Sequence, residues 1–332
     1  MQSGISASRE SAAISAALNS CLMLQLLMGI YTVVYAGTMY LCLSKSARSK
    51  SRRLVIFVIS GLYLSCLGIS VLQWSSLHHS IVTQGETRES AYLSVIGSGP
   101  MWSYVLLNML FYGLFVMADG LLVWRCYQVY KPSTMVLLVL LAFFFVELGL
   151  FIAGVLITGI TGPNRTIANI TLTNKLRGAL YFASFATTVT TTSLIAHRLH
   201  RAYHAHARLS VKLESMAPRR GGWLRHIAAV LVESAAVYSL VILVYAIGNA
   251  ASARAGEGAS MRNVAMYLEV VVAVTGGMAP TVLVARIAIT DPDYDTGASI
   301  RISTLRFHGQ HASDSNSTRA DEENGPSQMD DR

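Results

Sequence analysis

Charged residues are scarce in this chain of 332 residues: Asp, Glu, Lys and Arg together make up only 13%. Soluble domains carry about 25%, so the scarcity argues against a soluble enzyme, a nucleic-acid-binding protein and a disordered chain. Hydrophobic residues make up 53%, and the mean hydropathy is +0.47. This composition predicts an all-α, polytopic membrane protein whose main partner is the lipid bilayer, because helices satisfy their own backbone hydrogen bonds within lipid.

Patterns that bind metals or cofactors are missing as well. The four cysteines lie in or beside apolar segments and form no CxxC or Cys/His spacing, so neither a disulfide framework nor a zinc site is expected. None of the nine histidines is expected in the middle of a span, which argues against intramembrane zinc hydrolases and haem-binding bundles. We therefore expect no metal, no cofactor and no enzymatic activity.

Seven apolar segments are long enough to cross a bilayer, for which a helix needs about 20 residues. They predict a seven-transmembrane-helix bundle over 21–288, preceded by a short outer segment, 1–20. The polar tail, 289–332, is expected to be cytosolic and disordered from about residue 308. The expected spans are 21–43, 54–77, 101–125, 133–158, 177–197, 226–250 and 263–287.

Basic residues are unevenly divided between the two ends of this bundle. The loops and proximal tail at one end hold 17 Lys and Arg residues, and the loops at the other end hold seven. Cytosolic loops carry the excess of basic residues, so we expect the N-terminus outside and the C-terminus in the cytosol. The outer loop 159–176 then contains two glycosylation sequons, which begin at Asn164 and Asn169.

Four carboxylates fall within the expected spans: Asp119, Glu147, Glu233 and Glu269. An ionisable group in lipid costs a few kcal/mol or more, so these side chains should face the interior of the bundle. They either line a ligand or ion path or make hydrogen bonds that fix helix packing. Asp119 and Glu233 are expected at a similar inner depth and could face each other, or Arg125 could pair with one of them. Glu147 has aromatic neighbours and should be neutral if it lacks a partner.

The third and fifth spans carry further polar side chains. In the third span, Asn108, Tyr112, Phe115 and Asp119 recur at i, i+4, i+7 and i+11, which places them on one helical face. This face is a second part of the candidate ligand or ion path, or a packing seam. The fifth span is rich in Thr over 187–193, which either lines a pore or bonds to its own helix carbonyls.

Small residues share a face with the outermost of the four carboxylates. Glu269 is followed on one side of the seventh span by Ala273, Gly276 and Pro280. Small side chains allow a neighbouring helix to approach closely, and a proline inside a helix removes one hydrogen bond and favours a kink.

The loop 198–225 is the most basic segment, with seven Lys and Arg residues and one acid, Glu214. Such a segment is attracted to anionic lipids of the inner leaflet, by roughly 1 kcal/mol for each basic residue. His200 and His204 have the i, i+4 spacing of metal ligands, but a solvated basic helix explains them better. The acidic tail could compete for the same loop, and in a receptor this competition would gate a cytosolic signalling partner.

Two stretches carry a resemblance to known proteins. They are 118–127, ADGLLVWRCY, and 277–281, GMAPT. Both resemble the uncharacterised seven-helix membrane proteins of basidiomycete fungi, and the likeness covers most of 20–290. It implies an architecture and no functional residues. Rhodopsin-like receptor motifs are missing, because Arg125 has no acid before it and the seventh span has no NPxxY, and a retinal-binding lysine is also missing from that span.

The pattern as a whole favours a receptor-like sensor of an extracellular ligand, in the plasma membrane or an endomembrane. The alternative is a small-solute or proton-coupled transporter, because acids lie within the spans. A pocket open outside and closed toward the cytosol would favour the sensor. A continuous path through Asp119 and Glu233 would favour the transporter.

Overall fold

The computed structural model describes most of the apolar part of the chain. All described residues belong to the first of two compact units, Met1–Asp291. The second unit, Pro292–Arg332, lies outside the described residues, as do Asn164 and most of the basic loop 198–225. The described ranges are 7–44, 50–83, 85–97, 100–129, 134–161, 167–210, 233, 235–249 and 259–290.

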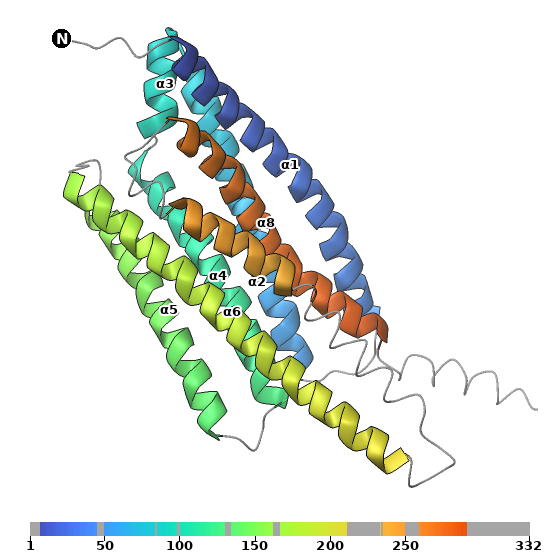
Figure 1. The fold of residues 1–332 in the computed structure, drawn as a ribbon. Coiled ribbons are helices and arrows are strands. Elements are labelled where there is room, and N and C mark those ends of the chain that lie inside the picture. Colours follow the sequence, from blue (N-terminus) through green and yellow to red (C-terminus); the bar gives the residue numbers. More distant parts are fainter. Residues whose placement is uncertain are drawn as a thin grey trace, which may run out of the picture. The chain divides into compact units, whose positions relative to one another are not determined.

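Within these ranges the chain is almost entirely helical, and no strand occurs in them. Residues 235–249 form a helix that carries no label in Figure 1. The labelled elements are α1 (Ala7–Ser44), α2 (Lys50–His78), the π-helical turn η1 (His79–Thr83), α3 (Arg88–Gly97), α4 (Met101–Val129), α5 (Thr134–Thr161), α6 (Ile167–Ser210) and α8 (Ala259–Thr290).

Six of the described helices are long and apolar enough to cross a membrane, which confirms the all-α polytopic architecture. They correspond to six of the seven expected spans. The remaining expected span, 226–250, is described only in part, and the described part is the shorter apolar helix Ala235–Asn249. The six helical stretches are Glu10–Ser44, Arg52–Thr83, Met101–Tyr127, Met135–Ile160, Thr171–Arg198 and Asn263–Arg286.

Large apolar side chains cover the outside of these helices. On α5, the side chains of Met135 and Ile160 are 80% and 84% exposed. Such a surface would be unfavourable in water, so the bilayer covers it. The protein is therefore in contact with lipid along its helices.

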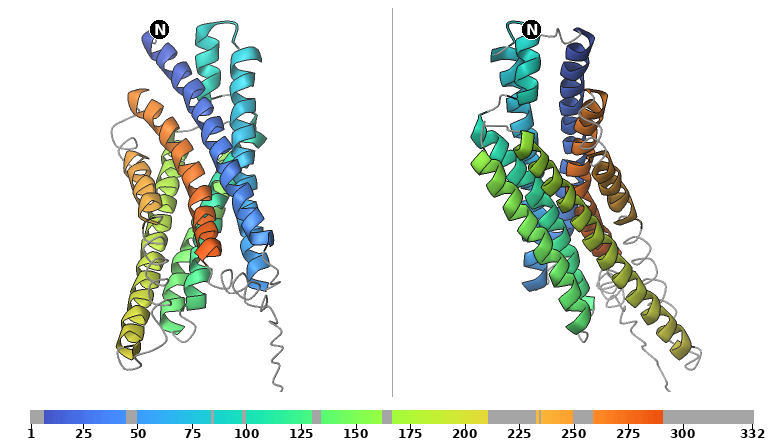
Figure 2. Two further views of the ribbon diagram at one scale, coloured as in Figure 1. Left: turned by 90° about the vertical axis from the view of Figure 1, so that its right-hand side faces the viewer. Right: turned by 60° about the vertical axis from the view of Figure 1, so that its left-hand side comes forward.

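Helices α1, α4, α6 and α8 begin at one end of the described unit, and α2 and α5 run in the opposite direction (Figures 1 and 2). Helix α8 packs against α1, α2 and α4, and α4 also packs against α5 and α6. The beginning of α8 and the end of α2 therefore lie at the end where α1 begins.

Two glycines of helix α8 lie close against neighbouring helices, and α8 continues past Pro280 as one helix. A Cβ atom at Gly277 would lie 2.8 Å from the Cys66 sulfur, and one at Gly276 would lie 2.6 Å from the Leu114 side chain. Neither position has room for a larger residue. The close approach that the sequence predicts for Gly276 is thus present.

Two short helical elements, η1 and α3, occur between the second and third expected spans, where the sequence predicts only a loop. Helix α3 is capped by Thr87 and Ser90, whose side chains each accept a hydrogen bond at 3.1 Å from the other's backbone N–H. Helix α3 packs against the beginning of α1, which starts at Ala7 rather than near Cys21. Burial of Ala13 accompanies this contact.

Candidate functional site

Helices α4 and α6 run in the same direction and share a polar seam. Toward the N-terminal ends of both helices, Arg177 Nε donates a hydrogen bond to Tyr112 Oη at 3.1 Å. Further along, Ser184 Oγ donates to Asp119 Oδ2 at 2.5 Å. Both pairs are separated by 65 positions in the sequence, so the two helices keep one register over this length. We call this contact the α4–α6 seam.

Aromatic rings fill the middle of the seam. The ring of Phe115 lies 5.6 Å from that of Tyr181, and Phe111 contacts Phe115 at 5.4 Å. Tyr245, from the helix 235–249, lies 4.8 Å from Tyr181. This aromatic layer separates Arg177 from the carboxylate at the other end. The face of the third span is therefore polar, aromatic and polar again, as its spacing predicts.

Asp119 is fully buried, and hydroxyl groups from α6 satisfy both of its oxygens. Ser184 binds Oδ2, and Thr188 Oγ1 donates to Oδ1 at 2.6 Å. A buried carboxyl group would lose much of its hydration energy without such donors. Two hydroxyl donors from one helix therefore hold Asp119 against α6.

Glu147, on α5, lies beside Asp119 and is equally buried. Apart from the Asp119 carboxyl, neither of its oxygens has a hydrogen-bond partner among the described residues. Tyr238 is buried close to both carboxyls. Two adjacent negative charges in so dry a site would be very unfavourable. The pair can therefore hold a proton, which neutralises at least one of the two carboxyls.

At the other end of the seam, Arg177 is half-buried rather than part of an outer loop. It interacts electrostatically with Glu269 of α8, but no direct ion pair joins the two side chains. Asn108 contributes less to a ligand path, because its amide donates to the carbonyl of Tyr104 in its own helix at 2.8 Å.

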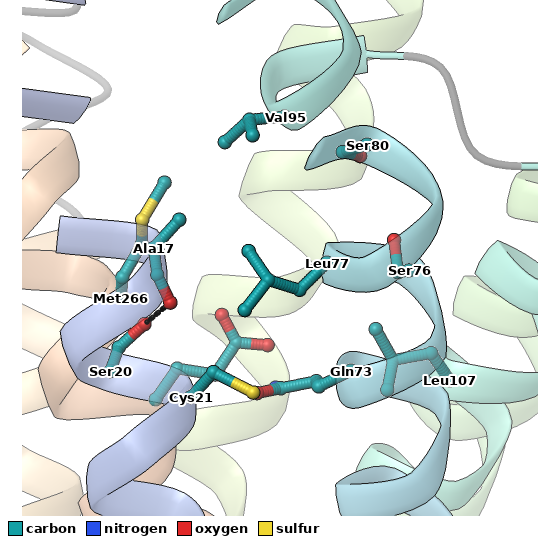
Figure 3. Close-up of a pocket in the computed structure, with 11 residues that line it drawn as sticks. Ala17, Ser20, Cys21, Gln73, Ser76, Leu77, Ser80, Val95, Leu107 and Met266 are labelled. Atoms are coloured by element: carbon teal, nitrogen blue, oxygen red, sulfur yellow. Dashed lines mark hydrogen bonds between the residues drawn. The ribbon is translucent and has the colours of Figure 1, made fainter. Parts of the chain in front are cut away.

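Glu269 also lines a pocket of about 230 Å³ near the beginning of α1. The polar part of the lining consists of Ser20, Gln73, Ser76, Ser80 and Glu269. Figure 3 shows the labelled side chains of α1 on one side of this space and those of α2 on the other. The pocket thus joins a carboxylate to hydroxyl and amide groups from three other elements.

The remaining lining of the pocket is apolar. It includes Leu77 of α2, Leu107 of α4, Met266 of α8 and Val95 of α3. Cys21 of α1, one of four free cysteines, also borders the space (Figure 3). A ligand in this pocket would contact a mixed surface with one acidic group.

Glu233 does not join either end of the seam. Its side chain is 74% exposed, and its carboxylate pairs with Arg286 at 3.7 Å. Asp119 and Glu233 therefore do not face each other. Arg125 pairs with neither carboxylate, and its Nη1 is buried without a hydrogen-bond partner in the described part of the chain.

Two threonines of α6 bond to their own helix. Thr187 donates to the carbonyl of Ala183 at 2.9 Å, and Thr191 donates to that of Thr187 at 2.7 Å. These bonds satisfy the hydroxyl groups within the helix and favour packing over a pore lining for both residues. Thr188 differs, because its hydroxyl binds Asp119.

Sequence reasoning missed the α6 side of the seam, although a signal was present. Arg177, Tyr181, Ser184 and Thr188 stand at i, i+4, i+7 and i+11, the same spacing as the face of the third span. Arg177, the first residue of the expected span 177–197, was counted with the basic residues of the outer side, which hid this pattern. Of the expected glycosylation sites, Asn169 lies in the first turn of α6, and its modification stays a prediction.

Comparison with known proteins finds no matching family model, no matching curated protein and no matching solved structure. The resemblance to the basidiomycete membrane proteins therefore stays a prediction. Within the described ranges, no group of three or more His, Cys, Asp or Glu side chains is placed to hold a metal ion. The seam and the pocket are accordingly interpreted from their own chemistry.

Proposed function

We propose that the protein is a receptor-like sensor of an extracellular ligand, built on seven transmembrane helices, in the plasma membrane or an endomembrane. The sixth of these helices, expected over 226–250, would consist of the apolar segment Ala235–Asn249 and the residues before it. The excess of basic residues in the loops at one end supports an outer N-terminus and a cytosolic C-terminus.

The pocket that contains Glu269 is the observation that carries this proposal. It lies toward the end where α1 begins, which is the outer end in the proposed orientation. The aromatic layer of Phe111, Phe115 and Tyr181 separates this end from Asp119. A ligand could thus reach the pocket from outside, while the packed core below it supports sensing rather than passage.

Proton-coupled transport is the second candidate function, and the Asp119–Glu147 pair favours it. Two buried carboxyls that share a proton are suited to carry it between two conformations. A transporter would need an aqueous route to this pair. Asp119 is instead fully buried and bonded to two hydroxyls, which supports the sensor over the transporter.

The orientation of the pocket is tested with its own cysteine. Intact cells that express the protein are treated with a membrane-impermeant thiol reagent, and modified peptides are identified by mass spectrometry. Cys21 is only 3% exposed, but it borders the pocket and should react there. Cys66 and Cys126 are also buried and are not among the residues that line the pocket, so they should not react. The variant Cys21→Ala should remove the signal. Reaction of Cys21 only after permeabilisation would overturn the outer location of the pocket.

Sensing and transport are separated by two assays of the full-length protein. In the first, coupling to heterotrimeric G proteins is screened in cells. In the second, the purified protein is placed in liposomes and proton flux is followed under a pH gradient. The sensor predicts a coupling signal and no flux above that of empty liposomes. Flux that disappears in Asp119→Asn would establish transport instead.

A further inference from the structure

The size of the pocket limits what it can hold. Pockets for drug-sized ligands typically measure about 300–1,000 Å³, whereas this pocket measures about 230 Å³. A peptide, a sterol or a lipid chain would not fit within it. A ligand that the pocket encloses is therefore a small molecule with few non-hydrogen atoms.

The charge of the lining indicates the sign of the ligand. Glu269 is its acidic residue, and no basic side chain is among the described residues that border the pocket. Arg177 interacts electrostatically with this carboxylate, but it is not in direct ion-pair contact and its Nε is already bound to Tyr112. The Glu269 carboxylate makes no hydrogen bond to another described side chain, so its acceptor capacity remains available.

We propose that the pocket binds a small organic amine, with its ammonium group on the Glu269 carboxylate and its short apolar body against Leu77 and Met266. This inference rests on the proposed function only for the side from which the ligand enters. Alkylamines are cationic at neutral pH, as the lysine side chain is. An ammonium group is a donor of up to three hydrogen bonds, and its bond to a carboxylate is charge-assisted.

The other polar groups of the pocket suit the same ligand. The side chains of Gln73, Ser76 and Ser80, which line the same pocket as Glu269, offer oxygen acceptors. An ammonium group can share its donors between such oxygens and Glu269. An anionic ligand would find no cation in the lining, and a neutral alcohol would lose the charge-assisted bond.

Three probes of one size test the proposal: butylamine, 1-butanol and butyrate. The purified full-length protein is heated with each probe, and the midpoint of thermal unfolding is recorded. A ligand that binds only the folded state raises this midpoint with concentration. Butylamine should raise it, while 1-butanol and butyrate should not. Equal effects of butylamine and 1-butanol would show that the ammonium group is not recognised.

Glu269→Gln should weaken the apparent affinity for butylamine by about tenfold or more, because a hydrogen bond to a charged group is lost. Glu233→Gln is the matched control, since it removes the same charge from an exposed site that pairs with Arg286, and it should leave the affinity unchanged. If Glu269→Gln does not fold, Glu269→Asp keeps the charge on a shorter side chain and should weaken binding less than tenfold. Unchanged binding in Glu269→Gln would overturn the proposal.

Protection of Cys21 gives a second, independent measurement. Butylamine in the pocket should slow the reaction of Cys21 with a small thiol reagent in detergent, and 1-butanol should not. If butylamine does not protect Cys21, but Cys21 reacts from outside intact cells, the amine-binding proposal is rejected and the outer location of the pocket is kept. If butylamine protects Cys21, but Cys21 reacts only after permeabilisation, the amine-binding proposal is kept and the proposed sensing of an extracellular ligand is rejected.

Discussion

Arg177 and Tyr112 are joined by a hydrogen bond of 3.1 Å between Nε and Oη, although 65 positions separate them in the sequence. The bond places a cation inside the bundle at the N-terminal end of the α4–α6 seam. An arginine at this depth is unfavourable unless its donors are satisfied. Tyr112 is therefore a structural anchor for an arginine at the first position of the expected span 177–197.

The variant Tyr112→Phe tests this anchor. It removes the acceptor and leaves Arg177 Nε without it, at a cost of about 1–3 kcal/mol. We expect a lower midpoint of thermal unfolding than in the unmodified protein. Tyr40→Phe is a suitable control, because Tyr40 is exposed and the same substitution there should change little. Equal stability of the two variants would contradict the anchoring role.

The contact between Asp119 and Ser184 gives a second prediction. Ser184→Ala should destabilise the protein by about 0.5–2 kcal/mol, the usual worth of a hydrogen bond between transmembrane helices. In the double variant with Asp119→Ala, the two effects should not add, because both remove the same bond. The measurement is unfolding in detergent or bicelles. Ser193→Ala, at an exposed position of the same helix, should have little effect, and additive losses would contradict direct coupling.

Glu147→Gln should fold and reach the cell surface normally. Gln keeps the shape of the side chain, and its amide can donate a hydrogen bond to Asp119 without adding a charge. Glu147→Arg should fail to reach the surface, because a larger cation cannot be accommodated at a fully buried position. Surface labelling of both variants provides the measurement. A functional defect in Glu147→Gln despite normal expression would show that ionisation of Glu147 matters.

The orientation of the chain gives the fourth prediction. The uneven distribution of basic residues predicts that a tag at position 2 is accessible from outside intact cells. A tag at position 332 should become accessible only after permeabilisation. Antibody labelling before and after permeabilisation provides the comparison, and the opposite pattern would reverse the orientation of the pocket as well.

The fifth prediction concerns the basic segment that begins near the end of α6. A peptide of 197–225 should bind vesicles that contain phosphatidylserine, and added salt should weaken the binding because the attraction is electrostatic. Vesicles of phosphatidylcholine alone serve as the control. Binding that is equal for both lipids, or insensitive to salt, would exclude recognition of anionic headgroups.

Hydropathy was sufficient to predict the long helices, because a lipid-facing span needs apolar residues on almost every side. Helix α6 is longer than its expected span, 177–197, because the polar residues at its ends pack against protein or face water rather than lipid. Helix α3 escaped prediction because a short amphipathic helix gives no membrane signal. Its cap at Thr87 and Ser90 was visible only once the helix was known.

The polar face with Tyr112 and Asp119 could also be predicted, but the helix that it meets could not. Depth alone suggested Glu233 as the partner of Asp119, and depth does not fix the rotation of a helix about its axis. That rotation depends on how all neighbouring side chains pack. Ser184 and Thr188 occupy the position instead, and Glu233 lies on an exposed side.

The equal sequence offset at both ends of the seam limits how the bundle can move. Sliding α4 along α6 by one helical turn, about 5.4 Å, would break the bond at Tyr112 and the bond at Asp119 in the same step. Gradual sliding is therefore unfavourable, and we expect the two helices to move together as one rigid body. Because Leu107 of α4 borders the pocket, a ligand that tilts α4 would swing α6 with it and displace the far end of α6, at Ser210.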